Sequence, residues 1–406
     1  MVYIKDIDGR PLMPTKRHGK VRWLLKENKA VVINLCPFTI QLTYKSTDHK
    51  QPVTLGIDAG AKHIGFSATT EKEELFACET ILRTDIVDLL STRSQNRRTR
   101  RSRLRYRKPK FNNRVFSKKK GWVAPSVKQR IDSHLNEVNE IHKILPITKI
   151  VIEAAQFDTH KMKNPNISGI DYQNGEQLGF WNVREYVLFR DGHKCSYCKG
   201  KSKDPILNIH HIESRKTGGD SPSNLITLCE TCHKEYHKGN IDLKVRRGKS
   251  LCGAAIMGIM KWRLYDELKS RYSNVSMTFG YITKYNRIKY GIEKSHTSDA
   301  FVISKNFNAK RIEYQYLKRL VRRHNRQIHK MKILKGGKKK NNQAPFEVFG
   351  FRLFDKVLYN NEINFIYGRR KSGNFNIRDF NGENPKDVSY KKLKLIRGKR
   401  HPIILK

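Results

Sequence analysis

The chain has 406 residues, and 83 Lys and Arg against 37 Asp and Glu give it a formal net charge of +46. This length allows two to four compact units, each with its own core. So much positive charge would repel itself in an isolated globule, so we expect a polyanionic partner, nucleic acid, along much of the surface. No apolar run approaches the ~18 residues of a spanning helix, and residues 1–14 contain no signal-peptide core. We therefore expect a cytoplasmic, nucleoid-associated prokaryotic protein without a membrane partner.

Residues 1–52 alternate short strand-like runs with turns, and a helix is expected over residues 19–28. The expected strands begin at Val2, Ala30 and Phe38. The segment Arg10-Pro11-Leu12-Met13-Pro14 resembles the PLMP segment of the IscB family's N-terminal domain. Taken alone, these five residues also fit a turn between two prolines.

An apolar strand over residues 53–60 carries Asp58 and ends in small residues, and residues 63–67 form a second strand. The pattern resembles the first RuvC segment, in which an RNase H-like fold places its first metal-binding carboxylate, and we assign residues 53–92 to it. Ala59 stands where that family more often has proline. A strand that leads into such a turn also occurs as a purely structural element.

The densest run of basic side chains lies in residues 93–110. A helix this basic has no apolar face for a core, so it is either disordered or held by phosphates. Its position after Asp58 resembles the arginine-rich bridge helix of IscB and of the type II CRISPR effector nucleases; the alternative is a solvated basic segment. The resemblance implies nucleic-acid contacts from Arg93, Arg97, Arg98, Arg100, Arg101, Arg103, Arg105 and Arg107.

Residues 111–160 are interpreted as a second RuvC segment. Ser126 is expected to cap a helix that ends before Pro146, and residues 149–153 form a buried strand. A carboxylate at the end of such a strand is costly to bury without a cation. Glu153 therefore resembles the second RuvC carboxylate, and an ordinary surface glutamate at a strand end is the alternative.

Residues 241–306 are interpreted as a linker followed by a third RuvC segment. We expect a helix over 254–271 and strands over 275–291, where aromatic and basic residues interleave. On a following helix, His296 and Asp299 lie one turn apart and share a face. The His-x2-Asp-Ala pattern resembles the third RuvC segment. The resemblance implies that Asp58, Glu153, His296 and Asp299 bind two Mg²⁺ ions that activate water and stabilise the leaving oxygen.

Between these segments, a polar linker (161–180) precedes a cysteine- and histidine-rich stretch at 181–240. Two Cys-x2-Cys pairs, Cys195 with Cys198 and Cys229 with Cys232, supply the thiolates of a structural Zn²⁺ site. Paired knuckles alone would also fit a zinc ribbon. A ribbon, however, needs no adjacent His210-His211, no Asn224 and no His233-x3-His237.

This histidine spacing resembles the HNH endonuclease motif of the ββα-metal type. The resemblance implies that His211 is the general base that activates water and that Asn224 braces the loop. It also implies that His210, His233 and His237 hold one Mg²⁺ against the scissile phosphate. A neutral imidazole can accept a proton near pH 7, while a metal stabilises the charge that develops on the phosphate.

The last hundred residues, 307–406, are strongly basic. We expect a helix over 313–331 and then several short strands that form a small β-rich, SH3-like or similar barrel. By position, this region resembles the IscB domain that meets the target-adjacent motif on duplex DNA.

Together the segments predict an α+β multidomain protein: a split RNase H-like core, an inserted HNH domain, an arginine-rich helix and small β-rich terminal domains. In this order they resemble IscB, a transposon-encoded RNA-guided nuclease. The resemblance implies a structured guide RNA, a double-stranded DNA target and a monomeric protein in a ribonucleoprotein. HNH would cut the guide-paired strand and RuvC the displaced strand. The alternatives are a RuvC/HNH nuclease that recognises branched or nicked DNA by shape, and a non-catalytic RNA-binding protein with a zinc knuckle.

Overall fold

The computed structural model describes residues 1–102, 121–154, 157–214, 218–246, 248, 251–322, 345–398 and 403–405. It divides into two compact units. The larger combines Met1–Gln156 with Ile256–Lys406, and the smaller, Phe157–Ala255, interrupts it in the sequence. In the described part of the chain, no helix has both the length and the apolar character needed to cross a membrane.

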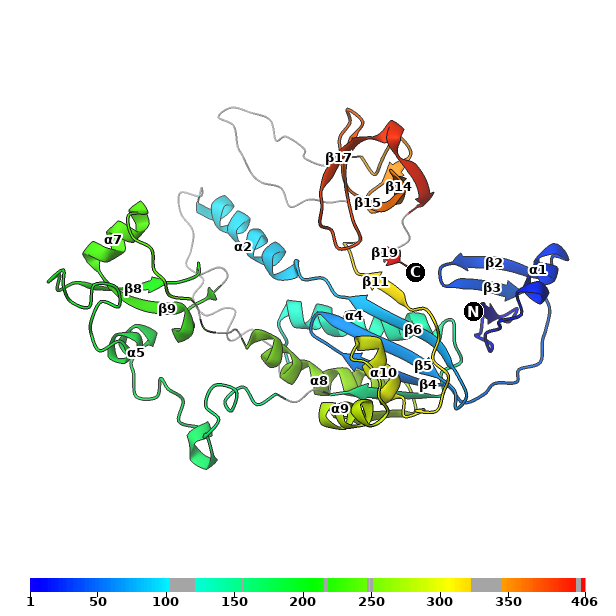
Figure 1. Ribbon diagram of the computed structural model, residues 1–406, viewed down its shortest axis with the longest axis horizontal. Coiled ribbons are helices and arrows are strands. Elements are labelled where there is room, and N and C mark those ends of the chain that lie inside the picture. Colours follow the sequence, from blue (N-terminus) through cyan, green and yellow to red (C-terminus); the bar gives the residue numbers. More distant parts are fainter. Residues whose placement is uncertain are drawn as a thin grey trace. The chain divides into compact units, whose positions relative to one another are not determined.

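A seven-stranded mixed sheet forms the centre of the larger unit (Figure 1), in the order β10-β7-β4-β5-β6-β11-β19. Strands β4, β5 and β6 are antiparallel neighbours, whereas β7 and β10 run parallel to β4. Strand β11 runs parallel to β6. The bounds are β4 (Thr54–Ala59), β5 (His63–Thr69), β6 (Glu74–Ile81), β7 (Lys149–Glu153), β10 (Val275–Thr278), β11 (Tyr316–Arg319) and β19 (Ile403–Leu405).

Helices cover both faces of this sheet. Helices α4 (Pro125–His142) and α8 (Cys252–Arg271) bury Leu135 and Leu264 in the main core, against strand residues such as Ile57. Successive side chains of a strand point to opposite faces, so Gly56 and Asp58 face the other way. Helix α10 (His296–Ile303) lies on that second face, against β4 and β5. The sheet thus separates the main core from the face that carries Asp58.

Two smaller subdomains belong to the larger unit. In the first, β1 (Tyr3–Lys5), β2 (Ala30–Leu35) and β3 (Phe38–Leu42) form a sheet with helix α1 (His18–Lys26), close to the expected elements. The second has a five-stranded antiparallel sheet, which confirms the expected β-rich character. Its bounds are β14 (Lys356–Tyr359), β15 (Glu362–Arg369), β16 (Asn374–Arg378), β17 (Lys386–Ser389) and β18 (Lys394–Arg397), and a short pair, β12 (Glu347–Val348) with β13 (Phe351–Arg352), precedes it.

The smaller unit contains a ββα element. Strands β8 (Leu207–His211) and β9 (Leu225–Cys229) pair antiparallel, and α7 (Glu230–Lys238) follows directly. Helix α5 (Val183–Arg190) precedes them, and the Asn182 side chain caps it by accepting from the Glu185 N–H. Two single-turn 3-10 helices, Gly169–Tyr172 and Pro222–Asn224, also lie in the described part of this unit.

Three local predictions were wrong. Ser126 does not cap α4, because Pro125, whose φ is fixed near the helical value, occupies the first turn after Ala124. Residues 275–291 are not all strand, because α9 (Gly280–Lys289) follows β10. The expected helix at 313–331 begins instead as β11, whose alternating burial places Tyr316 and Lys318 on the inner side.

The basic helix was predicted too short at its N-terminal end. Helix α2 spans Ile86–Ser102, so it begins on an apolar turn before the first arginine. The expected contacts Arg103, Arg105 and Arg107 lie outside the described residues. The expected C-terminal domain, 307–406, also contributes β11 and β19 to the central sheet.

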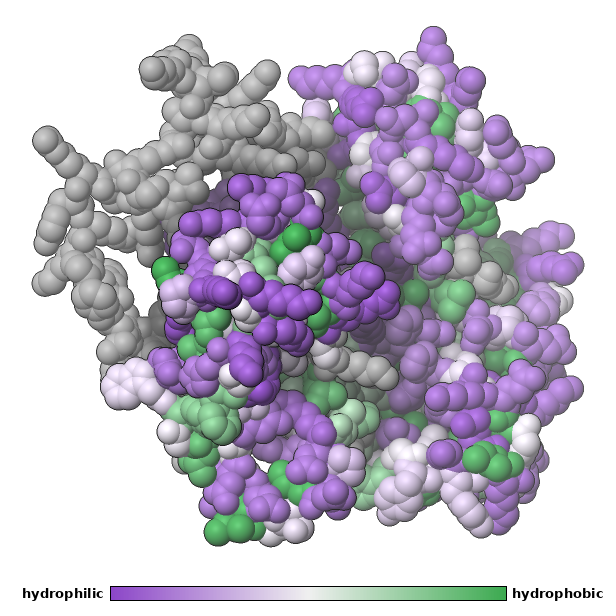
Figure 2. All heavy atoms as spheres, turned by 60° about the vertical axis from the view of Figure 1, so that its left-hand side comes forward, coloured by the Kyte–Doolittle hydropathy of each residue, from purple (hydrophilic) through white to green (hydrophobic). Residues whose placement is uncertain are grey.

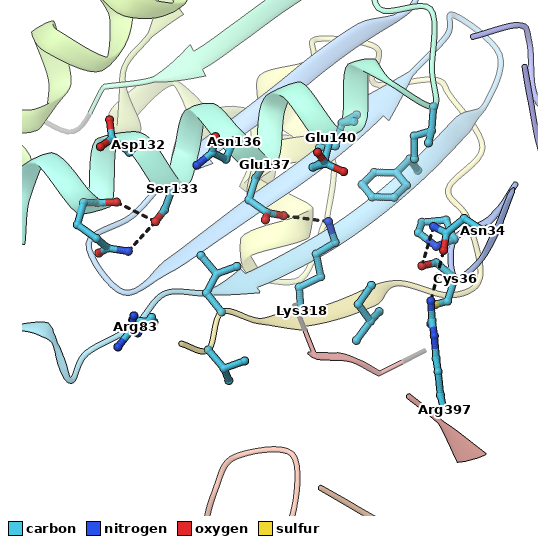
Figure 3. Close-up of a pocket in the computed structure, with 18 of the residues that line it drawn as sticks. Asn34, Cys36, Arg83, Asp132, Ser133, Asn136, Glu137, Glu140, Lys318 and Arg397 are labelled. Carbon is cyan, nitrogen blue, oxygen red and sulfur yellow. Dashed lines mark hydrogen bonds and ion pairs between the residues drawn. The ribbon is translucent and has the colours of Figure 1, made fainter. Parts of the chain in front are cut away.

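A cavity of about 740 Å³ lies beside α4 and β11. Figure 3 shows Lys318 reaching across to Glu137, and its ammonium donates to the carboxylate at 2.9 Å. Burial alone lowers the pKa of Lys318, but Glu137 and Cys78 more than offset this and the net pKa is raised. A buried charge needs such a partner, so this pair joins α4 to the sheet.

Burial of His134 on α4 makes the fold sensitive to acid. Its Nδ1 lies 2.8 Å from the Arg130 carbonyl oxygen, to which the neutral ring donates, and burial lowers the pKa of His134 to about 4. Between the unfolded value of ~6.5 and about 4, only the unfolded chain takes up the proton. We expect the free energy of unfolding to fall by roughly 3 kcal/mol across this window.

Urea unfolding at pH 7 and at pH 4.5 measures this loss. His134→Gln should have a smaller loss of stability than the wild-type protein, because glutamine has no proton to take up. The exposed His49→Gln is the matched control and should keep the full pH dependence. Equal pH dependence in both variants would contradict the assignment.

Candidate functional site

Four cysteines form a compact cluster in the smaller unit. Their sulfur atoms all lie within 4.8 Å of one another, and those of Cys198 and Cys229 are 3.8 Å apart. A tetrahedral zinc with Zn–S bonds of about 2.3 Å requires sulfurs about 3.8 Å apart. Hydrogen bonding from Ser202 lowers the pKa of Cys198 to about 6, whereas burial and the neighbouring thiols raise the pKa of Cys232. Geometry and donor chemistry therefore fit Zn²⁺.

The small unit depends on this cluster for its core. The buried core cluster around it consists of Cys195, Ile226, Leu228, Cys229 and Cys232, so three of its five members are sulfur ligands. We expect Cys229→Ser, or removal of zinc by a chelator, to unfold Phe157–Ala255 and leave the larger unit folded. Limited proteolysis with mass spectrometry would locate the change.

Cys36→Ser is the control for this prediction, because Cys36 is partly buried outside the cluster. It should leave the smaller unit resistant to protease, and added zinc should restore the chelated wild-type protein. A smaller unit that stays folded without zinc would contradict a structural role.

Three imidazoles converge where β8 meets α7. Their ligand nitrogens all lie within 4.8 Å of one another, and Nε2 of His233 is 3.3 Å from Nε2 of His237. Nε2 of His210 is buried without a hydrogen-bond partner. Burial and the two neighbouring histidines lower the pKa of His210 to about 4, and burial with His237 lowers that of His233. Neutral rings with lone pairs aimed at one point fit a divalent cation.

His211 follows His210 on β8 and so points to the other side of the strand. Its Nε2 lies 2.9 Å from Oδ1 of Asp220. A carboxylate in this position orients an imidazole and stabilises its protonated form. Asp220 is not among the residues predicted from the sequence, where its place in the turn after Gly218-Gly219 is the available signal.

The side chain of Asn224 lies in the loop between β8 and β9 and hydrogen-bonds to its backbone. The side chain is fully buried, accepts from the Glu213 N–H, and donates to the carbonyl oxygens of Glu213 and Gly219. A Cβ on Gly218 would lie 2.1 Å from Nδ2 of Asn224. Glycine is therefore required at 218 for these hydrogen bonds to form.

In the larger unit, the sheet and α10 bring four predicted residues together. Asp58 pairs in register with Glu153 on the neighbouring strand, and Nδ1 of His296 lies 2.7 Å from Oδ2 of Asp58. Asp299 follows His296 by one helical turn, and a side-chain oxygen of Ser295 caps the helix. The residues predicted from three distant segments thus form one centre.

Each carboxylate of this centre has its own neighbour. Nε of Arg287 lies 3.0 Å from Oδ1 of Asp299, and the Thr283 hydroxyl donates to Glu153. Burial raises the pKa of Glu153 to about 7, helped by Asp58 and Asp299 and opposed by Thr283. Burial and Asp58 also raise the pKa of Asp299, against Arg287. Neighbouring carboxylates repel one another when all are ionised, and a divalent cation relieves this repulsion. The three carboxylates are therefore a suitable set of ligands for divalent cations.

The residues that support these carboxylates are not predicted from the sequence. Thr283 and Arg287 are on α9, which was expected to be strand. On the opposite side, the ring of His63 stacks on that of His296 with centroids 5.2 Å apart. Nδ1 of His63 lies 2.8 Å from Oε1 of Glu79, so β5 and β6 together orient the histidine of α10.

The predicted nucleic-acid contacts that the structure describes lie on α2. Arg93 is exposed and Arg97 partly buried, while Arg98, Arg100 and Arg101 are placed only as positions along the helix. Figure 2 shows a face on which hydrophilic side chains predominate and hydrophobic ones are scattered, in keeping with the strongly basic composition.

Two families match separate parts of the chain. Residues 2–175 match the family described as RRXRR protein, and residues 97–101 read Arg-Arg-Thr-Arg-Arg. Residues 195–239 match the HNH endonucleases. A curated protein of Nostoc sp. (strain PCC 7120 / SAG 25.82 / UTEX 2576), called Anaredoxin, is 31% identical over 67 residues, which are 16% of this chain and 84% of that protein.

Solved structures with similarity to this chain include two Cas9 proteins. Streptococcus thermophilus Cas9 in complex with the AGAA PAM is 14% identical over 46% of this chain and 26% of its own, with a TM-score of 0.32. The Type II-C Cas9 enzyme from Actinomyces naeslundii is 11% identical over 63% of this chain and 60% of its own, with a TM-score of 0.26. The chain spans about a quarter of the Streptococcus protein. Neither TM-score indicates a shared overall fold.

Proposed function

Because this chain belongs to the HNH endonucleases through residues 195–239 and shares a family with the Nostoc protein, we propose that it is an RNA-guided DNA endonuclease of the IscB type. In this proposal the HNH unit cuts the guide-paired strand, and the RNase H-like (RuvC) centre cuts the displaced strand. The observation that carries the proposal is the presence of two separate constellations suited to phosphodiester hydrolysis in one basic chain. Two centres in two units match two strands of opposite polarity.

In the HNH unit, His211 acts as the general base and takes a proton from the attacking water. Asp220 orients the ring and stabilises its protonated form, and Asn224 keeps the β8–β9 loop in shape. His210, His233 and His237 would hold a divalent metal, which stabilises charge on the scissile phosphate when bound. Imidazole nitrogens suit Zn²⁺, Ni²⁺ or Fe²⁺, whereas Mg²⁺ prefers oxygen ligands. A transition metal therefore fits this set better than the expected Mg²⁺.

In the RuvC centre, Asp58, Glu153 and Asp299 supply oxygen ligands that suit the expected Mg²⁺ ions. When bound, such ions activate water and stabilise the leaving oxygen. His296 lies against Asp58 and can hold or move a proton there. Arg287 pairs with Oδ1 of Asp299.

A guide RNA explains the charge and the basic helix better than shape recognition alone. Helix α2 carries a dense run of arginines in its sequence, and a polyanion along the helix would neutralise their charge. The segment between α2 and α4 is also too short for a protein lobe that could hold a heteroduplex, so structured RNA would supply that scaffold. The rival, a nuclease that recognises branched or nicked DNA by shape, needs the same two centres but no RNA.

Sequencing the nucleic acid that co-purifies with the full-length protein separates these proposals. We expect a discrete structured RNA and cutting only of DNA that matches its guide. Alanine at Arg97, Arg98, Arg100 and Arg101 should weaken RNA binding and flatten its salt dependence. Absence of a discrete RNA, together with cutting that ignores sequence, would favour the rival.

The remaining expectations belong to the same proposal. One protein chain would act in each ribonucleoprotein, in a prokaryotic cytoplasm, on duplex DNA with a short adjacent motif. Size-exclusion chromatography with light scattering on the purified particle would test the single copy.

A further inference from the structure

We propose that α9 stacks the unpaired bases of the single DNA strand that reaches the Asp58 centre. This inference rests on the proposed function and deepens it, because it identifies the surface that presents the displaced strand to the RuvC carboxylates. The evidence is an exposed aromatic stripe on a helix whose other side holds those carboxylates.

The stripe consists of Tyr281, Tyr285 and Ile288, spaced four and three residues apart, so the three side chains share one face of α9. Their exposed fractions are 73%, 66% and 64%. Large side chains this exposed and this regularly spaced on one helix mark an interaction surface. Phe279 extends it, since its ring lies parallel to that of Tyr281 with centroids 6.1 Å apart.

A second face of the same helix holds the catalytic carboxylates. The Thr283 hydroxyl donates to Glu153, and Arg287 pairs with Asp299. A Cβ on Gly280 would lie 3.0 Å from Oε1 of Glu153, so the start of α9 lies directly against that carboxylate. At 3.6 residues per turn, the two faces are about 130° apart around the helix. The stripe is therefore fixed rigidly beside the centre.

Basic side chains complete the surface. Lys284 falls between the stripe and the carboxylate face, and Lys289 lies over the ring of Tyr290. Lys294 lies two residues before His296, at the start of α10. Glu293 is the acidic exception. Rings for bases, with lysines for the phosphates between them, make the pattern that holds single strands without sequence preference.

Unpaired DNA fits this surface better than structured RNA does. Stacking on a side chain requires a base that is free on one face, and a paired RNA stem presents mainly phosphates and 2′-hydroxyls. The strand that the RuvC centre would cut is by the proposal unpaired. A single-stranded segment can therefore stack its bases on Tyr281 and Tyr285. A phosphate of the same strand then contacts Lys284, and the strand continues toward Asp58.

The test uses the full-length protein with its own RNA and a DNA duplex whose displaced strand carries 2-aminopurine near the cut. The double variant Tyr281→Ala/Tyr285→Ala should cut the displaced strand roughly tenfold more slowly per lost ring and should quench 2-aminopurine less. The rate at which the HNH unit cuts the guide-paired strand should not change. Tyr281→Phe/Tyr285→Phe keeps both rings and should retain wild-type cutting and quenching.

Three outcomes would overturn the inference: unchanged cutting and quenching in the alanine variant, equal loss of both cuts, or loss of the RNA. The last two would assign the stripe to folding or to RNA. A single-stranded oligonucleotide that contains 2-aminopurine is also mixed with the protein in the presence of a chelator, which prevents cleavage. Quenching of its fluorescence then measures stacking alone. If the wild-type protein cuts neither strand but quenches the oligonucleotide through these tyrosines, the proposed function fails and the stacking surface stands.

Discussion

His211→Ala is expected to abolish cutting of the guide-paired strand while the displaced strand is still cut, and Asp58→Ala is expected to do the reverse. A general base contributes roughly 10²- to 10⁴-fold, and loss of a shared metal-binding carboxylate should cost at least as much. The two residues lie in different compact units, and each has its hydrogen-bond partner within its own centre, Asp220 for His211 and His296 for Asp58. Duplex DNA with a different label on each strand measures both cuts in one reaction.

Two exposed residues provide matched controls. His160 is an exposed histidine of the smaller unit, and Asp132 is an exposed aspartate on α4. Alanine at either position should leave both cuts near the wild-type rate. If His211→Ala or Asp58→Ala stops both cuts while the RNA remains bound, the centres are not independent and the division of strands between them is wrong.

Asp220→Asn would show whether the carboxylate beside His211 contributes through that histidine. The amide keeps the size of the side chain but loses the charge that stabilises the protonated ring. We expect slower cutting of the guide-paired strand, because the ring of His211 loses the carboxylate that orients it. Asn224→Ala, in contrast, should disturb the β8–β9 loop itself. An unchanged rate of guide-paired cutting in Asp220→Asn would leave the carboxylate without a role in catalysis.

The sequence identified residues whose chemical type is distinctive and missed those whose role depends on packing. Cysteine pairs, clustered histidines and a carboxylate at the end of an apolar strand carry their function in type and spacing, and the structure brings them together. Arg287, Thr283 and Glu79 are ordinary polar residues until the fold places them against Asp299, Glu153 and His63. No local pattern distinguishes them from surface residues.

Secondary structure was predictable for segments with one apolar face. The prediction failed where tertiary contacts determine whether a segment forms a helix or a strand. Helices α4 and α8 have regular apolar faces and were expected. On α9, interleaved aromatic and basic residues favoured strands, but its buried positions are set by Thr283 and Arg287 against the carboxylates. The sequence predicts a basic helix where β11 forms, because a lysine such as Lys318 is typical of an exposed surface. In the fold, Lys318 is buried and pairs with Glu137.

Gly65→Ala is expected to stop cutting of the displaced strand as completely as Asp58→Ala. A Cβ at this position on β5 would lie 1.9 Å from the backbone oxygen of His296. Backbone cannot rotate away as a side chain can, so the N-terminal end of α10 would have to move by more than 1 Å. That movement would take His296 and Asp299 away from Asp58 and lower the free energy of unfolding of the larger unit by about 1–3 kcal/mol or more.

Gly258→Ala on α8 is the matched control, because nothing lies within 4 Å of its added Cβ, and alanine there should keep both cuts and stability. Cleavage of each strand is measured together with thermal unfolding. The two measurements distinguish a displaced catalytic centre in a folded protein from loss of the fold. The guide-paired cut should persist in Gly65→Ala, since His211 belongs to the other unit. Normal cutting of the displaced strand by Gly65→Ala would mean that contact between β5 and α10 does not set the position of His296, and the centre would then have to be held together from α9 instead.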